Sequence, residues 1–115
     1  MTARRWRLSA AADADIVNIL RDSRSRFGGD QMSRYQALLM RAADLAGEAP
    51  MRVGSVARDD LLPGLRSLHI SAAARRRGGA AHLLLYVVAD GPAPVLILRV
   101  LHERMDPARH LGETE

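Results

Sequence analysis

The chain has 115 residues, of which 48% are hydrophobic, so we expect one domain over residues 1–115 with a core of its own. It contains no cysteine, which excludes disulfide scaffolds, cysteine nucleophiles and cysteine-bound zinc. All 17 basic residues are arginine and 13 residues are acidic, which gives a net charge of +4 at pH 7. Arginine favours contacts with phosphates and carboxylates, but this modest excess is also typical of a solvated surface.

Aromatic residues and long apolar stretches are both scarce. One Trp, one Phe and two Tyr are too few for the stacking platform on which many modules bind single-stranded nucleic acid. The purest apolar run, Leu83 to Ala89, is too short to span a bilayer, and no long apolar segment follows the basic N-terminus. We therefore expect a soluble, cytoplasmic protein that does not itself bind nucleic acid sequence-specifically.

The first half of the chain predicts a short strand followed by two amphipathic helices. Residues 4–8 alternate as in a strand, and Ser9 can cap a helix that ends at Gly28-Gly29. Asp30 can cap a second helix, with Gly47 as its C-terminal stop. Two helices joined by so short a turn form an antiparallel hairpin. Their apolar stripes are Ala12, Ile16, Ile19, Leu20, Ser23 and Phe27, then Tyr35, Leu38, Leu39, Ala42, Leu45 and Ala46.

The second half predicts strands separated by loops. Residues 50–64 are rich in proline and glycine, and residues 72–81, with Arg75, Arg76 and Arg77, predict a mobile basic loop. Strands are expected at residues 65–71, 83–89 and 95–102. The second of these is apolar throughout, as in a central strand buried on both faces. The order predicts an α+β fold, in which a small antiparallel sheet, joined by the N-terminal strand, carries the helical hairpin on one face.

Three segments of the second half carry a resemblance to a known family. They are Pro63-Gly64-Leu65-Arg66, His82 to Tyr86, and the ending from Ile97 to Asp106 followed by Ala108-Arg109-His110-Leu111. Together with the order of elements, they resemble the RelE/ParE superfamily of bacterial toxins, and the ending is similar to that of the ParE branch. One departure is Val87 after the strand tyrosine, where family members often have arginine.

The resemblance implies a toxin of a type II toxin–antitoxin pair. Such a protein needs no cofactor, inhibits DNA gyrase by protein–protein binding and is neutralised by a cognate ParD-like antitoxin. One alternative is a ribosome-dependent mRNA endonuclease of RelE type, in which Arg99, His102 and Arg104 would do the chemistry. Regular strand alternation places Arg99 and His102 on opposite faces, which weighs against this alternative. The other alternative is an inactive toxin relic that only binds antitoxin.

Both charged and apolar residues are candidates for binding the target or the antitoxin. Arg66 is expected to form an ion pair with Asp106 or Glu103, and His102 to form a hydrogen bond at its strand end. Ile16, Leu20 and Leu38 could belong to a groove, although the core is the more common place for them. The full set of candidates is Arg66, Arg75, Arg76, Arg77, Arg99, His102, Arg104, Ile16, Leu20 and Leu38.

The remaining motifs do not support a metal or nucleotide site. His102-Glu103 lacks the second histidine of a helical zinc-protease motif, and the four histidines have no persuasive ligand spacing. The Gly-Gly pairs at residues 28 and 78 lack the lysine of a phosphate-binding loop. We therefore expect no metal ion.

Overall fold

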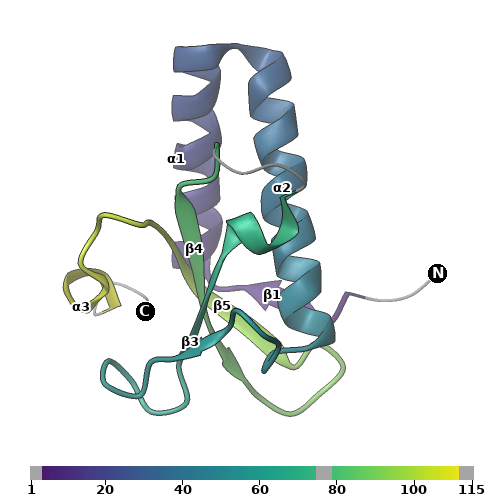
Figure 1. The fold of residues 1–115 in the computed structure, drawn as a ribbon, viewed down its shortest axis with the longest axis vertical. Helices are drawn as coiled ribbons and strands as arrows, with labels where there is room; N and C mark the ends of the chain where they lie inside the picture. The colour runs from purple at the N-terminus through teal and green to yellow at the C-terminus, as the bar shows by residue number, and fades with distance from the viewer. Residues whose placement is uncertain (1–3, 75–78, 112–115) are drawn as a thin grey trace.

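A computed structural model describes residues 4–74 and 79–111 of the chain (Figure 1). The candidates Arg75, Arg76 and Arg77 lie outside these ranges. The elements are β1 (Trp6–Leu8), α1 (Ala10–Phe27), α2 (Gly29–Glu48), β2 (Val56–Ala57), β3 (Arg66–His69), a 3₁₀ helix (Ile70–Ala73), β4 (His82–Val88), β5 (Val95–His102) and α3 (Pro107–His110). This order confirms the predicted α+β class, with an N-terminal strand, a helical hairpin and a sheet.

The strands form one five-stranded sheet in the order β1-β5-β4-β3-β2. As predicted, β4 is central and β1 lies beside a later strand. β1 runs parallel to β5, whereas the other neighbouring strands are antiparallel, so the sheet is mixed. The expected loop at residues 50–64 contains β2, whose two residues pair with Ser67 and Arg66. So short a strand has no local sequence pattern and exists only through its partner.

Gly28 sets the geometry of the helical hairpin. As predicted, the Ser9 hydroxyl accepts a hydrogen bond from the Ala12 N–H (3.0 Å) at the start of α1. The expected cap at Asp30 is wrong, because α2 already begins at Gly29. Gly28 has a φ of 90° and turns the chain directly from one helix into the next, and no side chain caps α2.

Gly47 is not the stop of α2 but a close contact between this helix and β1. The helix continues to Glu48, and Gly47 is buried within it. A Cβ atom at Gly47 would lie 3.2 Å from the Cβ of Arg5 and 3.3 Å from Cδ1 of Trp6. Glycine therefore serves here to let the helix approach the strand.

The main core lies between the helical hairpin and one face of the sheet. It is formed by residues such as Trp6, Ile16, Tyr35, Leu39, Leu68, Leu84, Tyr86, Ile97 and Val100, with Leu20 and Leu38 partly buried at its margin. A smaller cluster on the other face contains Leu65, Leu85 and Leu101. Of the ambiguous apolar candidates, Ile16 is thus a core residue, whereas Leu20 and Leu38 retain partial exposure.

A β-bulge interrupts the last strand. Leu85 pairs with Arg99, but the next residue, Tyr86, pairs with Ile97, so Leu98 has no partner on β4. Beyond the bulge the alternation of faces is inverted, and Ile97 and Val100 both lie in the main core. The regular alternation expected for residues 95–102 is therefore wrong from Leu98 onward.

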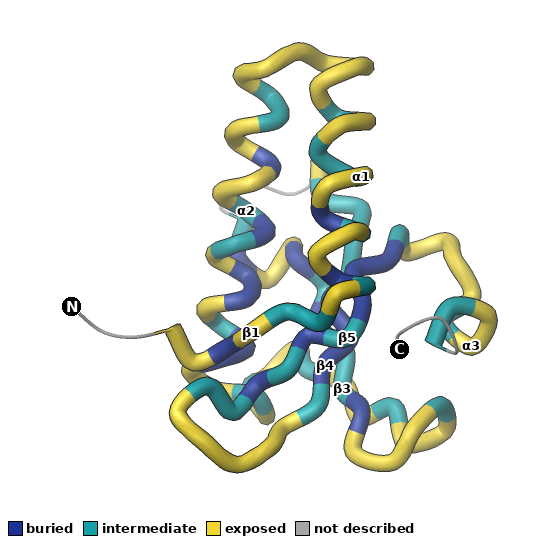
Figure 2. The backbone as a smooth tube through the Cα atoms, turned by 180° about the vertical axis from the view of Figure 1, so that it is seen from behind, coloured by how far each residue is buried: buried dark blue, intermediate teal, exposed yellow. Residues whose placement is uncertain are grey.

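The far end of the hairpin extends beyond the sheet. The only buried residues of α1 are Ala12 and Ile16, in its first half, and those of α2 begin at Tyr35. Figure 2 shows this end as mostly exposed. Among the described residues, no helix combines the length and hydropathy needed to cross a bilayer.

Candidate functional site

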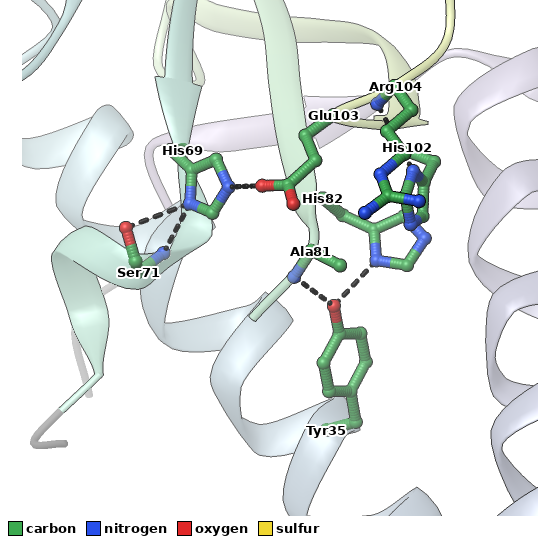
Figure 3. Close-up of polar contacts among 8 residues, drawn as sticks. All are labelled: Tyr35, His69, Ser71, Ala81, His82, His102, Glu103 and Arg104. Carbon is green, nitrogen blue, oxygen red and sulfur yellow. Dashed lines mark hydrogen bonds and ion pairs between the residues drawn. The ribbon is translucent and has the colours of Figure 1, made fainter. Parts of the chain in front are cut away.

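Three histidines that are distant in sequence meet at one end of the sheet (Figure 3). His69 ends β3, His82 begins β4 and His102 ends β5. His82 and His102 are direct partners across the antiparallel pair, with ring centroids 5.3 Å apart in an edge-to-face arrangement. The register of the sheet thus builds this histidine cluster from three single positions.

Tyr35 of α2 fixes the ring of His82. Its hydroxyl accepts a hydrogen bond from the Ala81 N–H (3.1 Å) and lies 2.5 Å from Nδ1 of His82. Burial raises the pKa of Tyr35, so its hydroxyl keeps its proton. Burial, and then the neighbouring His102, lower the pKa of His82 to about 4, so its imidazole is neutral at pH 7. The Tyr35 hydroxyl therefore donates to Nδ1 of His82, and the ring proton resides on Nε2.

The other two histidines have the same tautomer when neutral. Nδ1 of His102 accepts from the Arg104 N–H (3.1 Å), and Nδ1 of His69 accepts from the Ser71 N–H (3.2 Å). Nε2 of His69 donates to Glu103 (2.7 Å), and this hydrogen bond lowers the pKa of Glu103. The cluster therefore presents ring N–H groups as donors. Its carboxylate, Glu103, already accepts a hydrogen bond from His69.

A groove of about 540 Å³ lies between the histidine cluster and the far half of the hairpin. Its lining residues are Ile19, Asp22, Ser23, Arg26, Phe27, Gln31, Tyr35, Gly79, Ala80, Ala81, His82, His102 and Glu103, and we call it the histidine groove. A smaller cavity of about 170 Å³ shares His82 and His102 and is also lined by Asp15, Arg99 and His110.

Arg99 lies at this smaller cavity, but its guanidinium is engaged. Nε and Nη2 donate to the two carboxylate oxygens of Asp15 (2.7 and 2.8 Å), and Nη1 donates to the His110 carbonyl (2.7 Å). The residue is only 8% exposed. Asp15 also accepts from the Val100 N–H (2.9 Å), at the edge of β5 beyond its pairing with β1. Arg99 thus links α1, β5 and the C-terminal segment.

The bulge at Leu98 precedes Arg99, and the pairing from Arg99 to His102 is regular, as the expectation of opposite faces requires. Both residues nevertheless line the smaller cavity. General-base chemistry needs a free lone pair at the reacting group, whereas the Nδ1 lone pairs of His82 and His102 already accept hydrogen bonds, from Tyr35 and from the Arg104 N–H. The arrangement is therefore better suited to binding hydrogen-bond acceptors than to removing protons.

Arg66 does not form the expected ion pair with Asp106 or Glu103. Its Nε donates to the Ser55 hydroxyl (2.7 Å) and its Nη2 to the Ser55 carbonyl (3.1 Å), because β3 pairs with the segment that follows Ser55. Glu103 contacts His69 instead. The expected hydrogen bond of His102 at its strand end is present, with the Arg104 N–H.

Sequence reasoning missed much of the cluster. The structure adds Tyr35, His69, His82 and Glu103 to the candidate His102, and Phe27 to the groove. The sequence does offer one signal for the cluster. His82 directly precedes the predicted strand at residues 83–89, and His102 ends the next predicted strand, at residues 95–102. Within the described ranges, no group of three or more potential ligands could hold a metal ion.

Comparison with known proteins agrees with this fold. A family model described as ParE toxin of type II toxin-antitoxin system, parDE, matches residues 6–107. Toxin ParE1 of Mycobacterium tuberculosis is 36% identical over 107 residues, covering 93% of this chain and 97% of the relative. Toxin ParE of Escherichia coli is 32% identical over 108 residues, covering 92% and 91%. Toxin ParE1 of Caulobacter vibrioides is 31% identical over 107 residues, covering 93% and 97%. The chain therefore belongs to the ParE family of toxins of type II toxin–antitoxin systems.

Proposed function

We propose that this chain is a cytoplasmic toxin that inhibits DNA gyrase by protein–protein binding and is neutralised by a cognate, ParD-like antitoxin. The observation that carries the proposal is the family match over residues 6–107. We further propose that residues 1–115 act as one toxin domain without a cofactor.

The geometry favours binding over catalysis. The guanidinium of Arg99, a cation that the endonuclease alternative would use, is bound to Asp15 and to a backbone carbonyl. If the guanidinium left these contacts to bind a phosphate, the buried Asp15 carboxylate would lose its cation. The hydrogen bond from Arg99 to the C-terminal segment would also be lost. By contrast, the histidine groove offers an open surface with donors and apolar side chains, as a protein partner requires.

The test is a gyrase supercoiling and DNA-cleavage assay with the purified toxin. We expect the toxin to block supercoiling and to accumulate cleaved DNA, and a stoichiometric amount of co-purified antitoxin to restore supercoiling. If expression of the toxin kills cells while gyrase remains fully active in this assay, the proposal is wrong.

A second candidate is the ribosome-dependent mRNA endonuclease, favoured by one observation. Arg99 and His102 both line the smaller cavity, and Arg104 follows His102 by two residues. This candidate predicts mRNA cleavage in the ribosomal decoding site that His102→Ala abolishes. An inactive relic, in turn, would bind antitoxin tightly and be harmless when overexpressed.

A further inference from the structure

We propose that the contact between Tyr35 and His82 is a pH-sensitive latch, which holds the far half of the helical hairpin (residues 17–34) against the sheet and releases it when His82 binds a proton. Tyr35 belongs to α2 and His82 begins β4, so the latch joins the two layers of the fold. Both residues also line the histidine groove, so the shape of the groove depends on the latch. The latch would operate whether or not the chain inhibits gyrase.

In the closed latch, the Tyr35 hydroxyl makes two hydrogen bonds to the sheet layer (Figure 3). It accepts from the Ala81 N–H (3.1 Å) and donates to Nδ1 of His82 (2.5 Å). Tyr35 is only 8% exposed, and its ring meets the His82 ring edge to face, with centroids 5.5 Å apart. Nearer the tip of the hairpin, the described side chains form hydrogen bonds only within α1, as Arg26 does with Asp22. Tyr35 therefore makes the outermost polar contact of the hairpin with the sheet.

A proton on Nδ1 of His82 removes the acceptor of the Tyr35 hydroxyl. The hydroxyl would then face two donors, the Ala81 N–H and the new Nδ1–H, and its own proton would lose its partner. A buried polar group without a partner costs free energy, and so does a charge at the partly buried site of His82. Separation of α2 from the start of β4 lets water solvate both groups. The open latch is therefore the form that binds the proton.

The surroundings of His82 resist the proton as long as the latch is closed. His102 is its partner across the sheet, with ring centroids 5.3 Å apart, and His69 lies on the next strand. Burial, and then the positive charge of His102 and His69 when protonated, lower the pKa of His82 to about 4. In the open latch the ring is solvated, and its pKa returns toward the ordinary value of 6.5. Acid therefore favours the open latch between these two values.

The carboxylates around His82 do not reverse this preference. Asp22 and Glu103 raise the pKa of His82, but less than burial and His102 lower it. Each carboxylate that lines the histidine groove or the smaller cavity already has a donor: the pairs are Asp22 with Arg26, Glu103 with His69, and Asp15 with Arg99. The remaining titratable group of the smaller cavity, His110 of α3, cannot add a negative charge.

The rest of the hairpin remains attached when the latch opens. Its other polar contacts with the fold lie nearer the sheet and do not involve His82: Asp15 with Arg99, Arg41 with the Ala73 carbonyl, and Asp44 with Trp6. Between Ile16 and Tyr35 no residue of either helix is buried, so the far half has little apolar burial to lose. Protonation of His82 thus releases this half without unfolding the core.

The test is amide hydrogen exchange of the purified chain at pH 7 and pH 5. Protection is the exchange rate of an unprotected amide at the same pH divided by the measured rate. The Ala81 N–H is the direct reporter, because its hydrogen bond to Tyr35 breaks when the latch opens. The reference is the Val95 N–H, which bonds the Arg5 carbonyl (3.1 Å) at the other end of β5. We expect Ala81 to be less protected than Val95 at pH 7, and its protection to fall roughly tenfold or more at pH 5.

Three variants separate the proton on His82 from other effects of acid. His82→Gln has no imidazole to protonate, so its Ala81 protection should change by less than about twofold between the two pH values. His110→Gln is the matched control, because His110 is not among the groups that lower the pKa of His82, and it should show the wild-type fall. Tyr35→Phe keeps the ring and removes the hydroxyl, so Ala81 should lose its protection already at pH 7.

Four results would overturn the latch. Equal protection of Ala81 and Val95 at both pH values would show that the contact opens only when the whole fold unfolds, and this comparison needs no variant. Constant protection of Ala81 in the wild type would show that no proton acts on it. An equal fall in wild type and His82→Gln would place the proton on another group. Full protection of Ala81 in Tyr35→Phe would show that the hydroxyl does not cover this amide.

Discussion

At the scale of single residues, the pair of Arg99 and Asp15 joins helix α1 to strand β5. The side chains are only 10% and 14% exposed, and the carboxylate bonds both the guanidinium and a backbone N–H of β5. A buried pair of this kind adds little stability over an apolar pair, but the loss of one partner leaves an uncompensated charge. The pair therefore acts mainly to fix α1 against the bulged strand.

Asp15→Ala should destabilise the free toxin by about 3 kcal/mol, because it leaves the buried Arg99 guanidinium without its carboxylate partner. Asp13→Ala is the matched control on the same helix, where an exposed first-turn carboxylate contributes less than about 1 kcal/mol. Urea denaturation of both variants measures the difference. Equal losses for the two variants would show that the pair of Arg99 and Asp15 does not stabilise the fold.

The environment of His82 predicts a dependence of stability on pH. Its folded pKa of about 4 lies below the ordinary value of 6.5, so the unfolded chain binds a proton more readily than the folded chain does. The stabilising contribution of the neutral ring is complete above pH 6.5 and decreases as the pH falls from 6.5 to 4. The lowered pKa of Glu103 acts in the same direction, but below its ordinary value of 4.5.

Urea denaturation at pH 7, 5.5 and 4.5 can isolate this effect of His82. The wild-type chain should lose stability across the series, and His82→Gln should lose less, because glutamine does not titrate. His110→Gln provides a control, since His110 lies on α3 and is not among the groups that lower the pKa of His82. Parallel pH profiles for wild type and His82→Gln would contradict the prediction.

At the scale of elements, the approach of α2 to β1 depends on Gly47. Gly47→Ala adds helix propensity worth up to about 1 kcal/mol, but its Cβ would press on the Arg5 backbone at 3.3 Å. Overpacking typically costs about 1–3 kcal/mol, so we expect net destabilisation. In the same helix, Gly29→Ala meets nothing within 4 Å and should stabilise by a few tenths of a kcal/mol or more. Thermal denaturation should therefore give opposite signs for the two variants, and the same sign would contradict this account.

The elements that could be predicted are those whose signals are local. Ser9 caps α1 through its own hydroxyl, and the apolar run at residues 83–89 locates the central strand. Gly28, rather than Asp30, is the N-cap of α2, because its positive φ lets one helix follow another directly. β2 and the bulge at Leu98 arise from pairing between distant segments, which leaves no periodic pattern in the sequence.

The candidate site was predictable only in part, for the same reason. His102 stood out because it ends a recognisable strand, but its neighbours come from α2, β3 and β4. Their proximity depends on strand register and on which face of α2 carries Tyr35. Arg66 bonds Ser55 rather than an acid because the unpredicted β2 brings Ser55 beside it. A missed strand thus produced a wrong ion-pair partner.

At the scale of the whole molecule, the fold divides into a packed body and a projecting hairpin end. The main core connects the sheet with the first half of α1 and with α2 from Tyr35 onward. The far turns lie above the sheet in Figure 1, and no residue after Ile16 in α1 or before Tyr35 in α2 is buried. Stability within a domain follows such differences in burial, and binding segments often belong to its less stable parts.

Native-state hydrogen exchange should reveal this division in the free toxin. Amides of residues 20–27 and 30–34 should exchange at least tenfold faster than those of residues 13–17 and 39–46, because opening the far turns exposes little buried apolar surface. A protein partner that docks on the histidine groove should slow the fast group, because the far turns then acquire a partner that must leave before they open. Uniform protection in the free toxin would mean that contacts between the two helices alone stabilise their ends, and the exposed Phe27 would then lie on a rigid surface.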